Sequence, residues 1–286
     1  MKPAARLLLV LALVLATSAC GVRLAYHHLD WLAMRWVNKQ VSLNPVQEMT
    51  LRDALEATLD WHCASELPDY VPFLDRVAGT LSEDAVTVEQ IERMGDQAAG
   101  FGQRLVDQLM PSVIRLFTSL DDAQVQDLLA GIDKRNEEFR RERIELEPEE
   151  RRRERIDGMK RSLKRFIGST NEVQDQRLEQ WADSLLFVAP RMHSHQQQWR
   201  DKLANLLEDR HRHESFGPAL IELFEPAGDW PNDFRAVLAI NRQRTLQTLV
   251  EIHASLSQRQ RRRLLSRIRS LSSDFERLSC AEEGTA

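Results

Sequence analysis

The spacing of apolar residues constrains the fold of this chain more than any other feature of its sequence. Apolar residues recur at intervals of three and four, which places each set on one face of an α-helix, and no stretch shows the alternation of a half-buried strand. Two such sets are Leu51, Leu55 and Leu59, and Leu264, Leu265 and Ile268. With only 11 Gly and 10 Pro in 286 residues, little interrupts these patterns. We therefore predict an all-α fold, a multi-helix bundle of about ten to twelve helices joined by short loops.

Several helix starts share a local signature, in which an apolar residue precedes a small polar or acidic residue and its N3 position holds Gln or Glu. Clear copies begin at Leu43, Leu120 and Leu256, and looser copies begin at Val86 and Leu146. The polar residue can accept a backbone N–H bond as the N-cap, and the Gln or Glu can bond back to the N–H of the cap. Together with the apolar spacing, these starts predict helices over residues 24–40, 45–66, 69–80, 87–110, 112–119, 121–145, 148–167, 171–189, 191–212, 215–225, 231–255 and 257–279.

Two breaks stand out in the organisation of the chain. Residues 225–231 punctuate two helices with Pro and Gly, and a second boundary near Glu147 would divide the mature chain into two helical subdomains. The helix starts are unevenly spaced, so they predict no repeat of fixed period. Between Lys134 and Arg165 the sequence holds 13 basic and 9 acidic residues with a sparse apolar stripe. This composition is typical of a solvated helical arm, which would protrude from the bundle, or of a surface that docks a partner.

The N-terminus has the layout of an export signal. Lys2 and Arg6 precede the apolar run 7–16, which is about half the ~20 residues that a membrane-spanning helix needs. The sequence Thr17-Ser18-Ala19-Cys20 follows and resembles the lipobox of bacterial lipoproteins, with Thr17 where Leu is usual. The resemblance implies that residues 1–19 are a signal peptide and that Cys20 carries a thioether-linked lipid and an acylated N-terminus, with chains such as palmitate. The alternative is an ordinary secretory signal that happens to contain a cysteine.

The lipoprotein resemblance also implies a location. Gly21 follows the cysteine, and the absence of Asp at this position points, by the sorting rule of that family, to the inner leaflet of the outer membrane facing the periplasm. The membrane is then a partner of the chain through Cys20. Tyr26 and Trp31 lie only a few residues further on, so we consider them candidates for contact with the lipid interface.

Export to the envelope bears on whether the two remaining cysteines form a disulfide. After lipidation of Cys20, Cys63 and Cys280 are left in a compartment that oxidises thiols, and they can pair in only one way. Such a bridge would tie the C-terminal end to the early part of the chain. The alternative is two free, buried thiols.

Charge and motifs exclude several classes of function. Residues 20–286 have a net charge of −7, because Lys2 and Arg6 are lost from a chain with 39 basic and 44 acidic residues, and this does not favour nucleic acid as a partner. The mature chain has no Gly-rich phosphate loop, nucleophile elbow or zinc-protease helix. The pair His193 and His195 would point in nearly opposite directions on a helix, as would His211 and His213. We predict no catalytic residue, no metal site, no cofactor and no enzyme.

A run of arginines near the C-terminus lacks any intervening acid. Its members are Arg259, Arg261, Arg262, Arg263, Arg267 and Arg269. The run could meet anionic lipid headgroups or an acidic face of the same protein, and the net negative charge of the chain favours the second of these.

Two families resemble parts of the chain. The segments 22–26, 29–32, 43–47, 61–62 and 66–70 look like an uncharacterised family of Gram-negative lipoproteins, a domain of unknown function that implies an envelope location and a helical fold. The helix starts also look like the Leu-Thr-x-x-Gln motifs of the Spy and CpxP periplasmic chaperones, with Asn44, Asp121 and Ser257 in place of Thr. We expect a non-catalytic binding or scaffold module with a protein partner in the envelope, and the alternative is a Spy/CpxP-like chaperone or stress adaptor.

Overall fold

The computed structural model describes residues 26–225 and 230–280, and every regular element within them is a helix. The all-α prediction is confirmed. The predicted signal peptide and Cys20 lie outside the described residues. The elements are α3 (Leu29–Asn38), α4 (Pro45–Trp61), the π-helical turn η1 (His62–Glu66), α5 (Leu67–Ser82), α6 (Val88–Ser119), α7 (Asp122–Arg143), α8 (Pro148–Ile167), α9 (Glu172–Ser184), α10 (Ala189–Glu208), α11 (His213–Phe224), α12 (Asn232–Ala254) and α13 (Gln258–Leu278).

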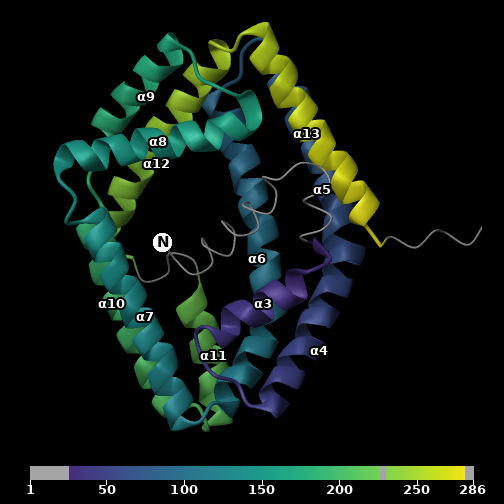
Figure 1. Cartoon of the computed structure of the whole chain (residues 1–286), viewed down its shortest axis with the longest axis vertical. Coiled ribbons are helices and arrows are strands. Elements are labelled where there is room, and N and C mark those ends of the chain that lie inside the picture. The colour runs from purple at the N-terminus through teal and green to yellow at the C-terminus, as the bar shows by residue number, and fades with distance from the viewer. Residues whose placement is uncertain (1–25, 226–229, 281–286) are drawn as a thin grey trace, which may run out of the picture.

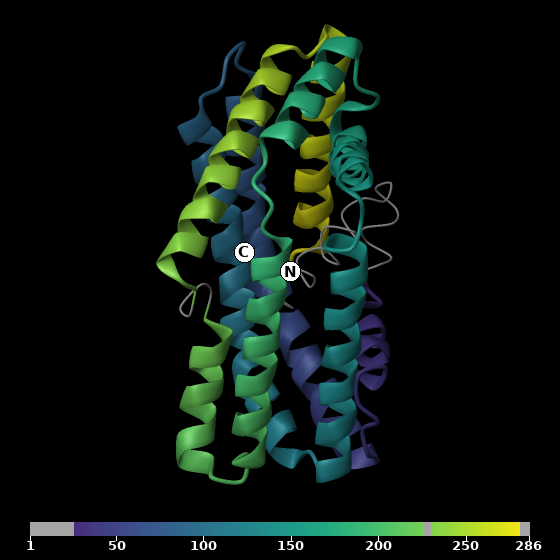
Figure 2. The same cartoon turned by 90° about the vertical axis from the view of Figure 1, so that its left-hand side faces the viewer.

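The helices form a flattened frame whose long axis is vertical in Figure 1. In that view α8, α9 and α12 form the upper left of the frame, α7 and α10 the lower left, and α13 and α5 the right-hand side, with α4 below them. α3 and α8 are drawn in front of their neighbours in Figure 1, and both lie at the right-hand edge of Figure 2. They therefore share one broad face of the frame.

In the described part of the chain, three apolar clusters of buried residues stabilise the frame. The lower core contains Leu120, Leu207 and Leu220, with Ile132 of α7. The upper core joins α8, α9, α12 and α13, and its members include Ile156, Leu178, Ile252 and Ile268. The side core packs Leu67, Tyr70 and Phe101 against the end of α13. Because α7 and α8 each contribute to a core, the charged segment 134–165 forms two sides of the frame and not the predicted protruding arm. The division near residue 147 stays a prediction.

The predicted helix starts rest on complete capping boxes. Asn44, Thr87, Asp121 and Ser257 each accept the N–H of the Gln at N3, whose side chain bonds back to the backbone N–H of the cap. Asn171 does the same for α9, although it does not follow the predicted signature because Thr170 replaces the apolar residue. At Glu147, by contrast, no side-chain cap forms.

Three predicted helix boundaries are wrong. α6 continues through Pro111, where a break was expected, because the buried Met110 and the adjacent Val113 and Ile114 hold that segment in place by packing. Proline removes one backbone hydrogen bond there, and the packing outweighs that loss. The predicted gap between residues 66 and 69 is absent, because α5 begins at Leu67 directly after the π-helical turn η1.

The third correction concerns α9, which ends at Ser184 and not at residue 189. The Leu186 N–H donates to Asn241 Oδ1 at 2.8 Å, and Asn241 Nδ2 donates to the Leu186 carbonyl at 2.9 Å. The amide of Asn241 thus takes the place of a backbone partner, which allows residues 185–188 to leave the helix.

Two pairs of buried glutamines lock loops together at opposite ends of the frame, and we call them the lower and upper clasps. In the lower clasp, Gln47 Nε2 donates to Gln124 Oε1 at 2.9 Å and Gln124 Nε2 donates to Gln47 Oε1 at 2.7 Å. In the upper clasp, the corresponding distances between Gln174 and Gln260 are 3.2 and 2.9 Å. The clasps join the starts of α4 and α7 at the bottom of Figure 1, and those of α9 and α13 at the top.

Each clasp glutamine uses all of its hydrogen-bonding capacity. The second N–H of each amide donates to the carbonyl of a serine two residues before the opposite N-cap; these serines are Ser119, Ser42, Ser255 and Ser169. The amide oxygen also accepts the N–H of its own cap residue. The full signature is therefore Ser, Leu or Thr, a polar cap, two further residues and Gln, and it occurs four times.

The predicted disulfide is present. Cys63 and Cys280 are bonded, with their Cα atoms 5.1 Å apart and a sequence separation of 217. The Cys280 N–H also donates to the Cys63 carbonyl at 3.0 Å. The bridge ties the end of α13 to the π-helical turn that joins α4 and α5, so it closes the right-hand side of the frame.

Candidate functional site

The outer face of α3 exposes large apolar side chains. Trp31 and Trp36 are 55% and 51% exposed, and the exposed Leu32 lies one turn before Trp36. α3 spans only 10 residues and buries Met34 against the frame, so a single row of its side chains suffices to hold it. Tryptophan side chains have a large apolar area, so it is unusual for two of them to remain half exposed on one short helix.

Cations lie among these aromatic residues. Trp31, Arg35 and Lys39 follow one another at intervals of four residues, so they form one row on α3. The Arg35 guanidinium carbon stands 5.5 Å from the centroid of the Trp31 ring, within reach of a cation–π interaction. Aromatic residues mixed with Lys and Arg are typical of helices that lie in the headgroup region of a membrane.

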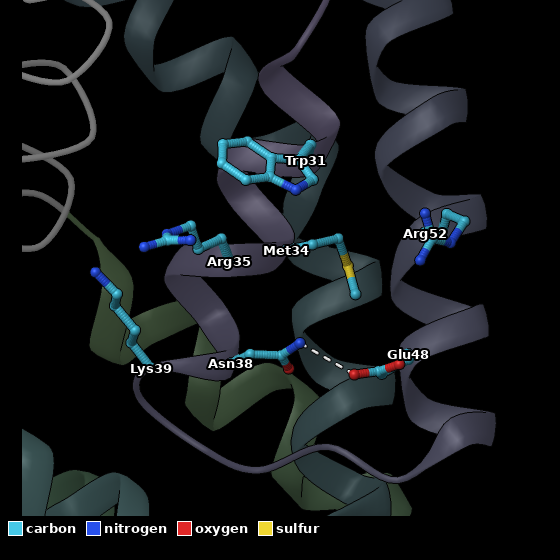
Figure 3. Close-up of a pocket in the computed structure, with 7 residues that line it drawn as sticks. All are labelled: Trp31, Met34, Arg35, Asn38, Lys39, Glu48 and Arg52. Atoms are coloured by element: carbon cyan, nitrogen blue, oxygen red, sulfur yellow. Dashed lines mark hydrogen bonds between the residues drawn. The ribbon is translucent and has the colours of Figure 1, made fainter.

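An open pocket of about 420 Å³ lies between α3 and the first turns of α4 (Figure 3). Its lining residues are Trp31, Met34, Arg35, Asn38, Lys39, Glu48 and Arg52. Figure 3 shows Met34 and Asn38 pointing from α3 toward α4, and Asn38 Nδ2 donates to Glu48 Oε1 at 3.0 Å. Three cations and one carboxylate surround an apolar wall, so the pocket suits a ligand that carries an anionic group beside an apolar chain.

The first turns of α4 also expose apolar side chains. Val46 and Met49 are both exposed, and they lie on the helix that packs against α3. We define the α3–α4 surface as the exposed apolar side chains of these two helices, Trp31, Leu32, Trp36, Val46 and Met49, together with the pocket between them.

The structure separates the two residues that the sequence nominates for membrane contact. Trp31 lies on the α3–α4 surface, whereas the Tyr26 hydroxyl donates to the Leu59 carbonyl at 3.4 Å and lies 3.1 Å from His62 Nδ1. Burial, with a smaller effect of Asp60, raises the pKa of Tyr26 to about 12. Tyr26 therefore packs against the end of α4, and only Trp31 enters the surface described above.

Behind Tyr26 lies a buried polar network that the sequence did not indicate. His62 Nε2 is 3.2 Å from the Tyr70 hydroxyl, and burial lowers the pKa of His62, with Glu66 opposing the shift. Glu66 accepts two hydrogen bonds from Arg104, at 2.6 and 2.9 Å. Both ring nitrogens of His62 and both carboxylate oxygens of Glu66 thus have partners within the protein, as a structural network requires.

The other histidines do not converge. His193 stacks on Phe139 with the ring centroids 6.4 Å apart, while His195 accepts the Trp230 indole N–H at 2.7 Å. In the described part of the chain, no group of three or more His, Cys, Asp or Glu side chains is placed to hold a metal ion. Nor does any described helix have the length and apolar character needed to cross a bilayer.

Comparison with known proteins gives one match. Residues 39–235 match the model of a protein family described as a family of unknown function (DUF6279), so the match covers α4 to α11 and the beginning of α12. No curated protein and no solved structure matches the chain.

Proposed function

Since the chain belongs to the DUF6279 family, which has no assigned function, we propose its role from its own surface. It is a lipid-anchored, periplasm-facing protein of the cell envelope that acts as a non-catalytic binding or scaffold module. The observation that carries this proposal is the α3–α4 surface, where half-exposed tryptophans and cations lie together shortly after Cys20.

The length of the chain between Cys20 and α3 supports the proposal. Residues 21–28 connect the two. A connection of this length spans at most about 30 Å when fully extended, so α3 is held near the membrane whenever Cys20 is lipidated. Acyl chains on Cys20 would supply the firm attachment, since each buried methylene contributes about 0.8 kcal/mol. The tryptophans and cations of α3 would then set which side of the protein faces the lipid.

The state of the buried polar groups supports a non-catalytic role. A general acid or base needs a free hydrogen-bonding position within reach of a substrate. His62 and Glu66 are buried, but Tyr26, Tyr70 and Arg104 occupy their hydrogen-bonding positions. Their arrangement explains how the π-helical turn is held, and it gives them no substrate to act on.

The anchor is tested in cells by membrane fractionation and mass spectrometry of the N-terminal peptide. We expect the wild-type protein in the detergent-soluble membrane fraction, with a lipid mass on Cys20, and we expect Cys20→Ala in the aqueous fraction. An unmodified Cys20 in a wild-type protein that fractionates with soluble proteins would contradict the proposal. Crosslinking of the lipidated protein in cells tests the scaffold role, which predicts the same envelope protein in independent experiments.

A chaperone role is the second candidate, and the clasps favour it. The segment at Leu43, which resembles those of Spy and CpxP, places the exposed Val46 beside the lower clasp, and the related segment that begins with Thr170 places the exposed Val173 beside the upper one. Such residues offer contact points for unfolded chains. The protein would then suppress the aggregation of an unfolded client protein at a near-stoichiometric ratio. The double variant Val46→Ser, Val173→Ser would suppress it less. Absence of suppression by the wild type would exclude this role.

A further inference from the structure

The structure brings together two segments that contain cations and no carboxylates. Residues 159–170 hold four cations, and residues 254–273 hold six arginines, in a chain whose net charge is −5. The ten cations are Lys160, Arg161, Lys164, Arg165, Arg259, Arg261, Arg262, Arg263, Arg267 and Arg269. We call the two segments together the basic tract.

The two segments meet where α8 ends and α13 begins. Gln260 Nε2 donates to the Ser169 carbonyl at 3.0 Å, and Ile167 and Leu264 share the upper core. The Arg263 side chain lies over Gly168, where an added Cβ would stand 3.5 Å from Arg263 Cδ. The cations of the two helices therefore belong to one region of the surface.

Intramolecular ion pairs neutralise only part of the tract. Lys160 pairs with Asp175 at 2.9 Å, and Arg261 donates to the Glu83 carbonyl. Among the described residues, no ion pair forms at Lys164, Arg165, Arg259, Arg262, Arg263 or Arg269. The sequence favoured an acidic face of the same protein as their partner, and the structure provides none for these six.

The position of the unpaired cations is electrostatically unfavourable in the isolated protein. Like charges repel across the tract, and the first turn of α13 contains no acid to complement the positive end of its helix dipole. An external anionic surface would remove this repulsion. The exposed Phe166 adjoins Arg165 on α8, so the tract also offers an apolar contact.

We propose that the basic tract is a second membrane contact that binds anionic phospholipid headgroups. α8 shares the broad face of the frame with α3 (Figures 1 and 2), so both can touch one flat surface. Binding at both places lays the frame along the bilayer instead of letting it hang from Cys20. The inference rests on the proposed function, because it takes the α3–α4 surface to face the membrane.

Vesicle flotation tests the tract directly. The protein is the mature chain, residues 20–286, with Cys20→Ser, so that acyl chains do not mask weaker contacts. Vesicles consist either of phosphatidylcholine alone or of phosphatidylcholine with one third phosphatidylglycerol. We expect the protein to bind the anionic vesicles more tightly. This preference is lost at high salt, because salt screens the attraction between exposed charges. The variant Arg165→Gln, Arg259→Gln, Arg262→Gln loses at least about tenfold in affinity for them.

A matched variant controls for the loss of positive charge. Arg93→Gln, Arg115→Gln, Arg235→Gln also removes three exposed arginines, but from α6 and α12, which lie away from the α3 side in Figure 2. Its affinity for anionic vesicles stays within about twofold of the parent. Circular dichroism of each variant confirms that the helices are retained.

The outcomes separate this inference from the proposed function. Trp31→Ala with Trp36→Ala weakens binding to both kinds of vesicle if α3 faces the membrane. If that variant loses binding while the tract variant binds as the parent does, the α3 contact stands and the tract inference is overturned. If the tract variant binds vesicles normally but no longer crosslinks to an acidic envelope protein, the ligand is a protein and the lipid assignment is wrong. Equal binding of the parent to both vesicles also overturns it.

Discussion

At the scale of single residues, the clasp glutamines stabilise the fold through buried hydrogen bonds that no other side chain there can make. Gln174 is fully buried, and the nitrogen and the oxygen of its side-chain amide each make two hydrogen bonds. Burial of an amide is costly unless its partners are in place, and removal of one glutamine leaves the others unsatisfied. The same side chain therefore caps a helix and joins two loops that are distant in sequence.

Gln174→Ala is expected to lower the free energy of unfolding by about 2–3 kcal/mol, because it leaves the Ser255 carbonyl and part of the Gln260 amide without partners. Gln90→Ala is the matched control: Gln90 closes the same kind of capping box at Thr87 but belongs to no clasp, so its loss costs about 0.5 kcal/mol. Urea unfolding monitored by circular dichroism measures both. Equal effects of the two substitutions would show that the clasps add nothing beyond helix capping.

His62 gives the stability a pH dependence. Burial lowers the pKa of His62 in the folded protein, so below its ordinary value near 6.5 the unfolded chain binds more protons than the folded one. Stability is then highest above that value and falls as the pH is lowered through it toward the folded pKa, with a slope of at most about 1.4 kcal/mol per pH unit. Urea unfolding between pH 7.5 and 5 is expected to show a smaller slope for His62→Gln than for the wild type. Parallel curves for the two proteins would contradict this assignment.

At the scale of elements, local interactions determine where helices start, and tertiary packing determines how they meet. Capping boxes act over four residues, so the starts of α4, α7 and α13 could be predicted from the sequence. The pairing of Cys63 with Cys280 could also be predicted, because they are the two cysteines that remain after Cys20. The clasps could not be predicted, because Gln47 and Gln124 are 77 residues apart and their pairing depends on how loops meet. The continuity of α6 through Pro111 likewise depends on packing that a local signal does not contain.

The candidate site, too, could be predicted from the sequence only in part. Trp31 was identifiable from its closeness to Cys20, but its exposure is a consequence of how α3 packs, as is the removal of Tyr26 into the network with His62. The pocket between α3 and α4 needs residues from both helices, and no spacing in the sequence relates Arg35 to Arg52.

The two exposed tryptophans of α3 are expected to contribute to membrane contact much more than to stability. Trp31→Ser with Trp36→Ser changes the free energy of unfolding by less than about 1 kcal/mol, since both side chains are already half in water. Met34→Ala, on the buried face of the same helix, costs about 2–3 kcal/mol. Thermal or urea unfolding distinguishes the two faces. A large loss of stability from the tryptophan pair would mean that they belong to a core.

At the scale of the whole molecule, a frame built around three apolar clusters is stabilised by links between its sides. The disulfide provides one of them, because it closes a loop across 217 residues of sequence and joins α13 to the turn between α4 and α5. The clasps provide two more, at the ends of the long axis. Charge is also distributed unevenly over the molecule, since ten cations without a carboxylate gather where α8 meets α13, although the chain as a whole is acidic.

Cys63→Ser with Cys280→Ser is expected to lower the free energy of unfolding by about 2–5 kcal/mol, because the unfolded chain regains the entropy that the long loop had lost. Thiol titration of the denatured, unreduced wild type is the accompanying measurement, and it finds no free sulfhydryl when Cys20 is lipidated. Two titratable thiols, or a double variant as stable as the wild type, would contradict the role of the bridge.

The contact of α3 with the membrane is tested most directly by quenching of tryptophan fluorescence with brominated phospholipids. The lipidated protein is reconstituted in vesicles, and the wild type is compared with Trp31→Phe, Trp36→Phe, which retains the other four of its 6 tryptophans. We expect quenching and a blue shift in the wild type, because Trp31 and Trp36 lie among the headgroups, and loss of most of the quenching in the variant. Equal quenching in both proteins, or none in the wild type, would show that α3 does not face the membrane.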